Sequence, residues 1–227
     1  MRFGKTLRNA INPAWKDKYV EYAKLKSLLR EDSEDDSRWT EDDENKFCDE
    51  ILNVQLEKVA EFQASTFRSL EARTNKAAEK LQELAPIAED GEAQASTAPT
   101  AKFKEIEGEL DDIINQTKEL KKYSNINYTA FLKIVKKHDR RRGSNYKIRP
   151  MLLLSLSKRP FNSEQDYSPL LNKLSMMYYA VRQQLERSDP SPAASTDAQS
   201  QTQNGEKYYA HKCRSSLADC GTFLIVE

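Results

Sequence analysis

The feature of this sequence best suited to chemistry is a cluster of four cationic side chains spaced three or four residues apart, namely Lys133, Lys136, Lys137 and Arg140. At about 100° per residue in a helix, they fall within an arc of roughly 100° and share one face. Like charges at these spacings repel by about 0.2–0.5 kcal/mol per pair. The cluster is therefore either a solvated basic face or a site for a polyanion, and the four residues alone leave both interpretations open.

A second basic stripe lies near the N-terminus, where Lys18, Tyr22, Lys26 and Arg30 recur every fourth residue on the polar side of a predicted helix. Tyr22 falls between this stripe and the apolar side, so it is either an aromatic at the edge of the core or a hydroxyl that contacts a ligand. If the two basic stretches meet in the fold, Tyr22, Lys26 and the Lys133–Arg140 cluster line one basic surface. A small, densely charged anion needs such convergence of Lys and Arg from different elements.

The charges of the chain balance overall but are segregated along it. The 227 residues hold 36 Lys or Arg and 36 Asp or Glu. Residues 1–30 contain eight basic and two acidic residues, residues 31–50 two and eleven, and residues 133–149 eight and one. A nucleic-acid-binding protein usually carries net positive charge and aromatics interleaved with it, so this distribution argues against a nucleic-acid partner.

Other chemistries find little support in the sequence. His211, Cys213 and Cys220 form a partial metal set without a fourth ligand, so no metal is expected. A glycine-rich phosphate loop, a nucleophile motif and paired carboxylates on one helix face are missing, so we expect neither an enzyme nor catalytic residues. Three cysteines without a framework spacing predict a reduced intracellular protein. Because no apolar run is long enough to span a membrane, we expect a cytoplasmic chain without its own membrane span.

The N-terminal basic stretch is predicted to lie on a small pair of helices. Phe3, Leu7 and Ile11 repeat every fourth residue, which predicts a short amphipathic helix over residues 1–10. Asn12 and Pro13 then start a second helix, since Asn caps well and Pro is tolerated in the first turn. Its apolar side predicts that it continues to about Arg30.

Two long helices follow the acidic loop 31–40. Thr40 is a good N-cap, and the apolar positions beyond it predict a helix to about Leu84. Pro86 and residues 89–99 predict a flexible connection. A second helix starts near Thr100, with a regular apolar stripe made of Phe103, Ile106, Leu110, Ile113, Ile114, Thr117 and Leu120. Two long helices joined by a loop pack most simply as an antiparallel hairpin.

The basic cluster is predicted to lie on a separate helix after this hairpin. Residues 124–127 interrupt the apolar pattern, so Asn127 is expected to cap the basic helix and Gly143 to end it. The apolar run 151–154 and a turn-rich connector, 159–168, follow. Pro169 then starts a further helix, and residues 188–205 lack apolar anchors, which predicts disorder. The predicted fold class is all-α.

Three separated blocks of this sequence resemble blocks of an SPX domain, and they occur in the same order along the chain. They are Met1-Arg-Phe-Gly-Lys5, Trp15–Lys26 and Asn127–Arg140, supported by the long-helix segment 46–62, and the resemblance covers about residues 1–145. It implies a long antiparallel helical hairpin with a small N-terminal helical pair and short C-terminal helices. It also implies binding of inositol polyphosphates or pyrophosphates such as inositol hexakisphosphate, which report cellular phosphate, with no cofactor.

The same resemblance assigns ligand contacts by motif to Tyr22, Lys26, Lys133, Lys136, Lys137 and Arg140. Arg140 stands where the family commonly has lysine, which keeps the charge but changes the donor geometry. Residues 159–178 are similar to the linker that follows SPX in fungal vacuolar transporter chaperone subunits. That similarity implies an accessory subunit of the complex that makes polyphosphate, held at the cytosolic face of the vacuolar membrane by the other subunits.

The expected domain organisation follows from these blocks. Residues 1–145 form the SPX domain, 146–187 a linker with a helix over 169–187, and 188–227 a disordered or aberrant tail. Residues 210–227 depart from what is expected at the start of the family's tunnel domain, which predicts a truncated, alternatively spliced or frame-shifted product. The alternative to a phosphate-sensing subunit is a helical protein-interaction scaffold, or the regulatory domain of another phosphate-homeostasis protein.

Overall fold

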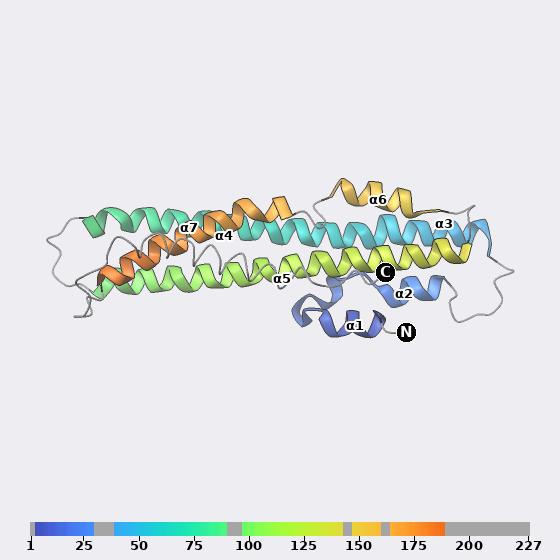
Figure 1. The fold of residues 1–227 in the computed structure, drawn as a ribbon, viewed down its shortest axis with the longest axis horizontal. Helices are drawn as coiled ribbons and strands as arrows, with labels where there is room; N and C mark the ends of the chain where they lie inside the picture. Colours follow the sequence, from blue (N-terminus) through green and yellow to red (C-terminus); the bar gives the residue numbers. More distant parts are fainter. Residues whose placement is uncertain (1–2, 30–38, 90–96, 143–146, 160–163, 189–227) are drawn as a thin grey trace, which may run out of the picture. The chain divides into compact units, whose positions relative to one another are not determined.

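A computed structural model describes residues 3–29, 39–89, 97–142, 147–159 and 164–188. Every regular element in these ranges is helical and none is a strand, which confirms the all-α prediction (Figure 1). The elements are α1 (Phe3–Ala10), the 3-10 helix η1 (Pro13–Lys18), α2 (Tyr22–Leu28), α3 (Glu41–Asp49), the π-helix η3 (Glu50–Gln55), α4 (Leu56–Glu89), α5 (Thr97–Arg142), α6 (Arg149–Ser157) and α7 (Glu164–Ser188). None of the described helices has an apolar stretch long enough to cross a membrane.

The chain forms two compact units. The first unit comprises residues 1–66 and 119–163, and the second comprises 67–118 and 164–227. The two long helices α4 and α5 contribute residues to both. All six predicted ligand-binding residues belong to the first unit.

The first unit is built on an antiparallel pair, as predicted. Glu44 near the start of α3 lies 2.9 Å from His138 near the end of α5, and farther along, the rings of Phe62 and Tyr123 are 5.1 Å apart. Residue numbers therefore rise along one helix as they fall along the other. The predicted cap at Thr40 is confirmed, because its hydroxyl accepts a hydrogen bond from the Asp43 N–H and the Asp43 carboxylate accepts one from the Thr40 N–H.

The second unit packs α4, α5 and α7 together. Lys80 of α4 contacts Glu109 of α5 at 2.9 Å, and Lys173 of α7 donates to Asn75 at 2.7 Å. The predicted stripe on α5 is buried in full. Helical spacing also puts seven apolar residues on one side of α7; Leu185 is half-buried and the other six are buried, namely Leu170, Leu171, Leu174, Met177, Tyr178 and Val181. The helical periodicity therefore predicted the apolar faces correctly.

The predicted break before the basic helix is wrong. Instead, α5 runs without interruption through residues 124–127 to Arg142. Asn127 is fully buried inside the helix, where its Nδ2 donates to the Tyr123 carbonyl at 2.8 Å and its Oδ1 accepts from the Val20 N–H at 2.9 Å. The polar side chain is therefore satisfied by a partner segment and does not end the helix. Gly143 lies outside the described residues.

The predicted single helix from Pro13 to Arg30 is also wrong. Asn12 does cap the start, since its Oδ1 accepts from the Ala14 N–H at 3.0 Å, but the first piece is the short 3-10 helix η1. The chain then extends at Tyr19 and Val20 before α2 begins. The Val20 and Glu21 N–H groups bond to the side chains of Asn127 and Gln55, so they are not available for a continuous helix.

Three helix boundaries differ from prediction, and the first is the start of α5, at Thr97 and not near Thr100. α4 continues to Glu89, past the expected end near Leu84, so Pro86 lies in its last turn. α7 begins at Glu164, so Pro169 lies inside it. The Tyr167 ring is buried and packs edge-on against Phe67 at 5.6 Å, which holds the turn before Pro169. The loop 31–38, residues 90–96 and the tail after residue 188 lie outside the described residues.

Candidate functional site

The basic cluster occupies the exposed side of α5 in the first unit. Lys133, Lys136 and Arg140 are exposed and Lys137 is half-buried. The residues that helical spacing puts beside or behind them are all buried, namely Phe131, Ile134, Val135 and His138. Within the described part of the chain, no carboxylate pairs with Lys133, Lys136 or Arg140. Lys133, Lys136 and Arg140 therefore carry positive charge that no carboxylate of the described residues offsets.

The N-terminal helices contact this face. The Lys133 ammonium lies over the Phe3 ring of α1, 5.0 Å from its centroid, and Phe3 packs edge-on against Tyr22 of α2 with centroids 5.1 Å apart. α1 and α2 accordingly lie beside the C-terminal part of α5 (Figure 1). The two basic stretches, separated by about a hundred residues in sequence, thus adjoin in space.

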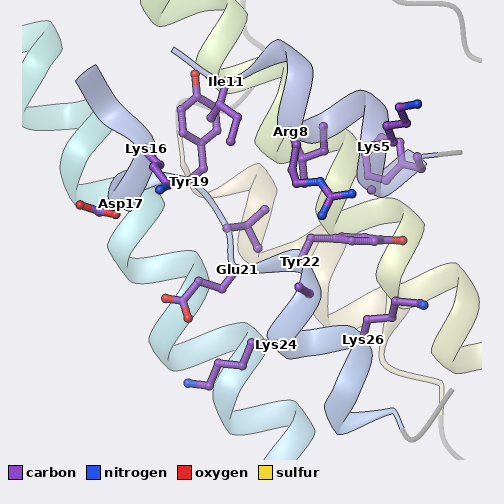
Figure 2. A pocket seen from close by; sticks show the side chains of 15 residues that line it. Lys5, Arg8, Ile11, Lys16, Asp17, Tyr19, Glu21, Tyr22, Lys24 and Lys26 are labelled. Atoms are coloured by element: carbon purple, nitrogen blue, oxygen red, sulfur yellow. The ribbon is translucent and has the colours of Figure 1, made fainter. Parts of the chain in front are cut away.

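Tyr22 has a buried aromatic ring that carries a hydroxyl group. The residue is only 8% exposed, and burial raises the pKa of its hydroxyl above the ordinary value. The hydroxyl therefore stays protonated at neutral pH and can donate a hydrogen bond. It points to the same side as the ammonium of Lys26, a half-buried residue one turn further along α2 (Figure 2). The burial of the Tyr22 ring at the edge of the core is therefore compatible with donation of a hydrogen bond by its hydroxyl.

A groove of about 680 Å³ opens between α1, η1 and α2 next to these side chains (Figure 2). Leu7, Ile11, Tyr19, Val20 and Tyr22 contribute apolar lining, and Lys5, Arg8, Lys16, Lys24 and Lys26 contribute positive charge. The ammonium of Lys24 is committed to Glu50 at 2.8 Å, an interaction that raises the lysine pKa. The α5 cations do not line this groove.

Lys5 and Arg8 adjoin the candidate site but were absent from the sequence-based site residues. Both are exposed on α1 and line the groove. Their spacing of three residues on a short amphipathic helix is the signal that points to them. The motif resemblance did not select them, because it drew its contacts from α2 and the basic part of α5.

Buried polar contacts fix the N-terminal segment against α5. The Tyr123 hydroxyl donates to the Lys18 carbonyl at 2.8 Å, and the Tyr19 and Tyr123 rings pack with centroids 4.7 Å apart. Burial raises the pKa of both phenols, so both remain protonated. With the Asn127–Val20 and Gln55–Glu21 bonds, these contacts determine where Tyr22 and Lys26 lie relative to α5.

A buried polar cluster anchors the end of α5 and was not predicted. Fully buried His138 lies 2.9 Å from Glu44 through Nε2 and 2.9 Å from Asp139 through Nδ1, and its ring stacks on Phe47. Trp39 Nε1 donates to the same Glu44 carboxylate at 3.0 Å. Among the described residues, no group of three His, Cys, Asp or Glu side chains is arranged to hold a metal ion. We therefore interpret the cluster as a structural clamp between α3 and α5.

The cysteine in this clamp should be chemically inert. Burial and the neighbouring Glu44 carboxylate raise the pKa of the Cys48 thiol from 9.0 to about 11. Below that pH the thiol stays protonated, and only the thiolate is nucleophilic, so near neutral pH Cys48 should react about a hundredfold more slowly than an ordinary thiol. Reaction with a disulfide reagent in a chain carrying Cys213→Ser and Cys220→Ser measures this rate. The same chain unfolded in guanidinium is the control, and equal rates in the two states would contradict the expectation.

Comparison with known proteins extends the sequence resemblance. No protein-family model matches the chain. It is 33% identical to vacuolar transporter chaperone complex subunit 2 of Saccharomyces cerevisiae over 86% of the chain, and 33% identical to subunit 4 of Schizosaccharomyces pombe over 93%. The chain spans only 23% and 28% of the length of these two relatives. It is also 27% identical to SPX domain-containing protein 5 of Oryza sativa, over 86% of the chain and 71% of that protein.

The fold agrees with these sequence relationships. The SPX domain of Chaetomium thermophilum glycerophosphodiester phosphodiesterase 1, solved in complex with inositol hexakisphosphate, superposes with a TM-score of 0.59. The match covers 80% of this chain and 99% of that domain, at 22% identity. The expected helical-bundle fold is thereby confirmed. The chain is thus similar in sequence to vacuolar transporter chaperone complex subunits 2 and 4, and it has the fold of an SPX domain.

Proposed function

We propose that the first unit binds inositol polyphosphates or pyrophosphates at the surface shared by α2 and α5. The observation that carries this proposal is the Lys133–Phe3–Tyr22 contact, which brings the cations of α5 beside the hydroxyl and ammonium of α2. The proposed ligand-binding residues are Tyr22, Lys26, Lys133, Lys136, Lys137 and Arg140. The solved SPX domain bound to inositol hexakisphosphate has the same fold and supports this class of ligand.

Each proposed contact has a distinct chemical role. The ammonium groups of Lys26 and Lys133 donate charge-assisted hydrogen bonds to phosphate oxygens from two different helices. The Tyr22 hydroxyl supplies a neutral donor whose direction is fixed by its buried ring. Arg140 offers a planar guanidinium that can engage two oxygens of one phosphate. A ring carrying several phosphates can engage donors on both helices together.

We further propose that binding reports cellular phosphate to a vacuolar transporter chaperone complex and regulates polyphosphate synthesis. The relationship to subunits 2 and 4 supports this assignment. In this proposal the chain regulates and does not catalyse, and other subunits of the complex hold it at the cytosolic face of the vacuolar membrane. Residues 1–145 act as the sensing domain and 146–187 as the linker to the rest of the complex.

Calorimetric titration of the chain with inositol hexakisphosphate tests the proposed ligand, and a single-stranded RNA provides the competing polyanion. We expect saturable binding of the inositol phosphate and much weaker, salt-sensitive binding of RNA. Charge reversal at Lys136 and Arg140 should abolish the inositol phosphate signal. An interaction scaffold predicts no specific binding of inositol hexakisphosphate, so charge reversal would change nothing in the titration. Preferential binding of RNA would favour a nucleic-acid function.

A further inference from the structure

One face of α6 exposes large apolar side chains that the proposed function does not use. Met151 is 55% exposed, Leu153 39% and Leu154 59%. Leu152 and Leu156 on the opposite face are buried. A core-facing helix of nine residues needs one apolar side, whereas α6 has two. The second apolar side therefore requires a separate explanation.

Positive charge surrounds this face. Lys147, Arg149 and Lys158 are exposed, and residues 147–159 contain no Asp or Glu. At about 100° per residue, Met151, Leu153 and Leu154 lie within an arc of roughly 160°, and Arg149 and Lys158 fall at or beside this arc. The surface is therefore both apolar and cationic, and its partner should be apolar and anionic.

α6 presents this face from a fixed position within the first unit. Arg159 pairs with Glu57 at the beginning of α4 and donates to the Ser155 carbonyl at 2.9 Å. α6 accordingly lies beside the adjoining part of the long helices (Figure 1). Because Leu152 and Leu156 are buried, α6 cannot turn its outer face inward without losing that packing.

We propose that the face formed by Met151, Leu153 and Leu154, with Lys147, Arg149 and Lys158, docks on an anionic lipid surface. Met151 and Leu154 protrude more than half exposed, which suits insertion between fluid headgroups that deform around them. A protein partner would instead need a preformed acidic groove matched to this outline. The surrounding cations match anionic headgroups, and no nearby acidic residue in the segment opposes their approach. This proposal concerns a surface distinct from the proposed inositol phosphate site.

Co-sedimentation of the full chain with vesicles of phosphatidylcholine, with or without phosphatidylserine, tests the proposal. We expect binding to the vesicles that contain phosphatidylserine and little binding to the neutral ones. The double variant Met151→Gln/Leu154→Gln should bind at least about tenfold more weakly, because two inserted apolar groups are lost. Met176→Gln is the matched control, since Met176 is 74% exposed on α7 in the second unit, and its binding should be unchanged.

A cation variant gives an independent result if the apolar variant folds poorly. Lys147→Gln/Arg149→Gln/Lys158→Gln should lose most of the preference for phosphatidylserine, at roughly fivefold per cation near the surface. Lys102→Gln/Lys104→Gln is the control, because both residues are exposed on the part of α5 that belongs to the second unit. Absence of vesicle binding by the parent chain, or equal loss in both cation variants, would overturn the proposal.

Inositol hexakisphosphate separates this surface from the cations of the α2 and α5 surface. With that probe in excess, binding to phosphatidylserine vesicles should persist, because the α6 face is free of the ligand. Complete loss of vesicle binding would show that Lys133, Lys136 and Arg140 carry the lipid contact and would overturn the assignment to α6. Persistent vesicle binding together with failure to bind inositol hexakisphosphate in calorimetry would refute the proposed function and leave the membrane surface standing.

Discussion

Lys26→Ala and Lys133→Ala are each expected to weaken binding of inositol hexakisphosphate by about 1–3 kcal/mol, which corresponds to roughly 5- to 150-fold. Each substitution removes a charge-assisted hydrogen bond to phosphate from one of the two helices. Neither ammonium is buried in the core, since Lys133 is exposed and Lys26 half-buried, so the free energy of unfolding should change little. Calorimetric titration and thermal unfolding measure the two effects separately.

Lys104→Ala provides the matched control for loss of one positive charge. Lys104 is exposed on α5 like Lys133 but belongs to the second unit. Its substitution should leave the affinity nearly unchanged, because exposed charges that far from a site are screened by salt. If Lys26→Ala and Lys133→Ala bind the inositol phosphate as tightly as the parent chain, then α2 and α5 do not share a site.

Asn127→Ala is expected to destabilise the fold by about 2–3 kcal/mol. The substitution leaves the buried Val20 N–H without its acceptor and opens a small cavity inside α5. Because the same bond positions the chain just before Tyr22, affinity for inositol hexakisphosphate should fall as well. Urea denaturation measures the change in unfolding free energy, and titration of the folded fraction measures the affinity.

Asn75→Ala is the control for this substitution. Asn75 also accepts a hydrogen bond from a distant part of the chain, Lys173, but it is exposed, so its loss should cost less than about 1 kcal/mol. Equal destabilisation by the two variants would contradict the account of Asn127 as the link between the N-terminal segment and α5.

The sequence predicted most of what depends on local periodicity. The buried stripes of α5 and α7, the cap at Thr40 and the solvent-facing position of the basic cluster each follow from spacing within one element. The two long apolar stripes predicted the helical hairpin, and the resemblance to SPX domains added the class of ligand. The assignment of the six ligand-binding residues remains a prediction.

Features that depend on distant partners were not predictable in the same way. Asn127 was predicted to be a helix cap because of its residue type. Its side-chain oxygen instead accepts a hydrogen bond from the Val20 N–H, 107 residues earlier in the chain. The Glu44–His138 contact joins residues separated by 94 positions, and neither side chain carries a local signal for the other. The break at Tyr19 and Val20 likewise arises from side chains of α5 and η3 that accept backbone N–H groups.

The charge arrangement predicts that ligand and local order are coupled. Repulsion among the α5 cations sums to roughly 1–2 kcal/mol over four pairs at helical spacing, and the basic N-terminal helices lie against them. We expect this surface to be the least stable part of the first unit without ligand. A bound polyanion removes the repulsion, and at about a hundred times its dissociation constant it stabilises the assembled state by about 2.7 kcal/mol.

Hydrogen exchange with and without inositol hexakisphosphate tests the shared surface most directly. The account predicts that amides in residues 3–29 and in residues 127–142 both become more protected when the ligand binds, while residues 164–188 of the second unit change little. Increased protection confined to residues 127–142, under conditions where calorimetry confirms binding, would contradict a site shared by α2 and α5.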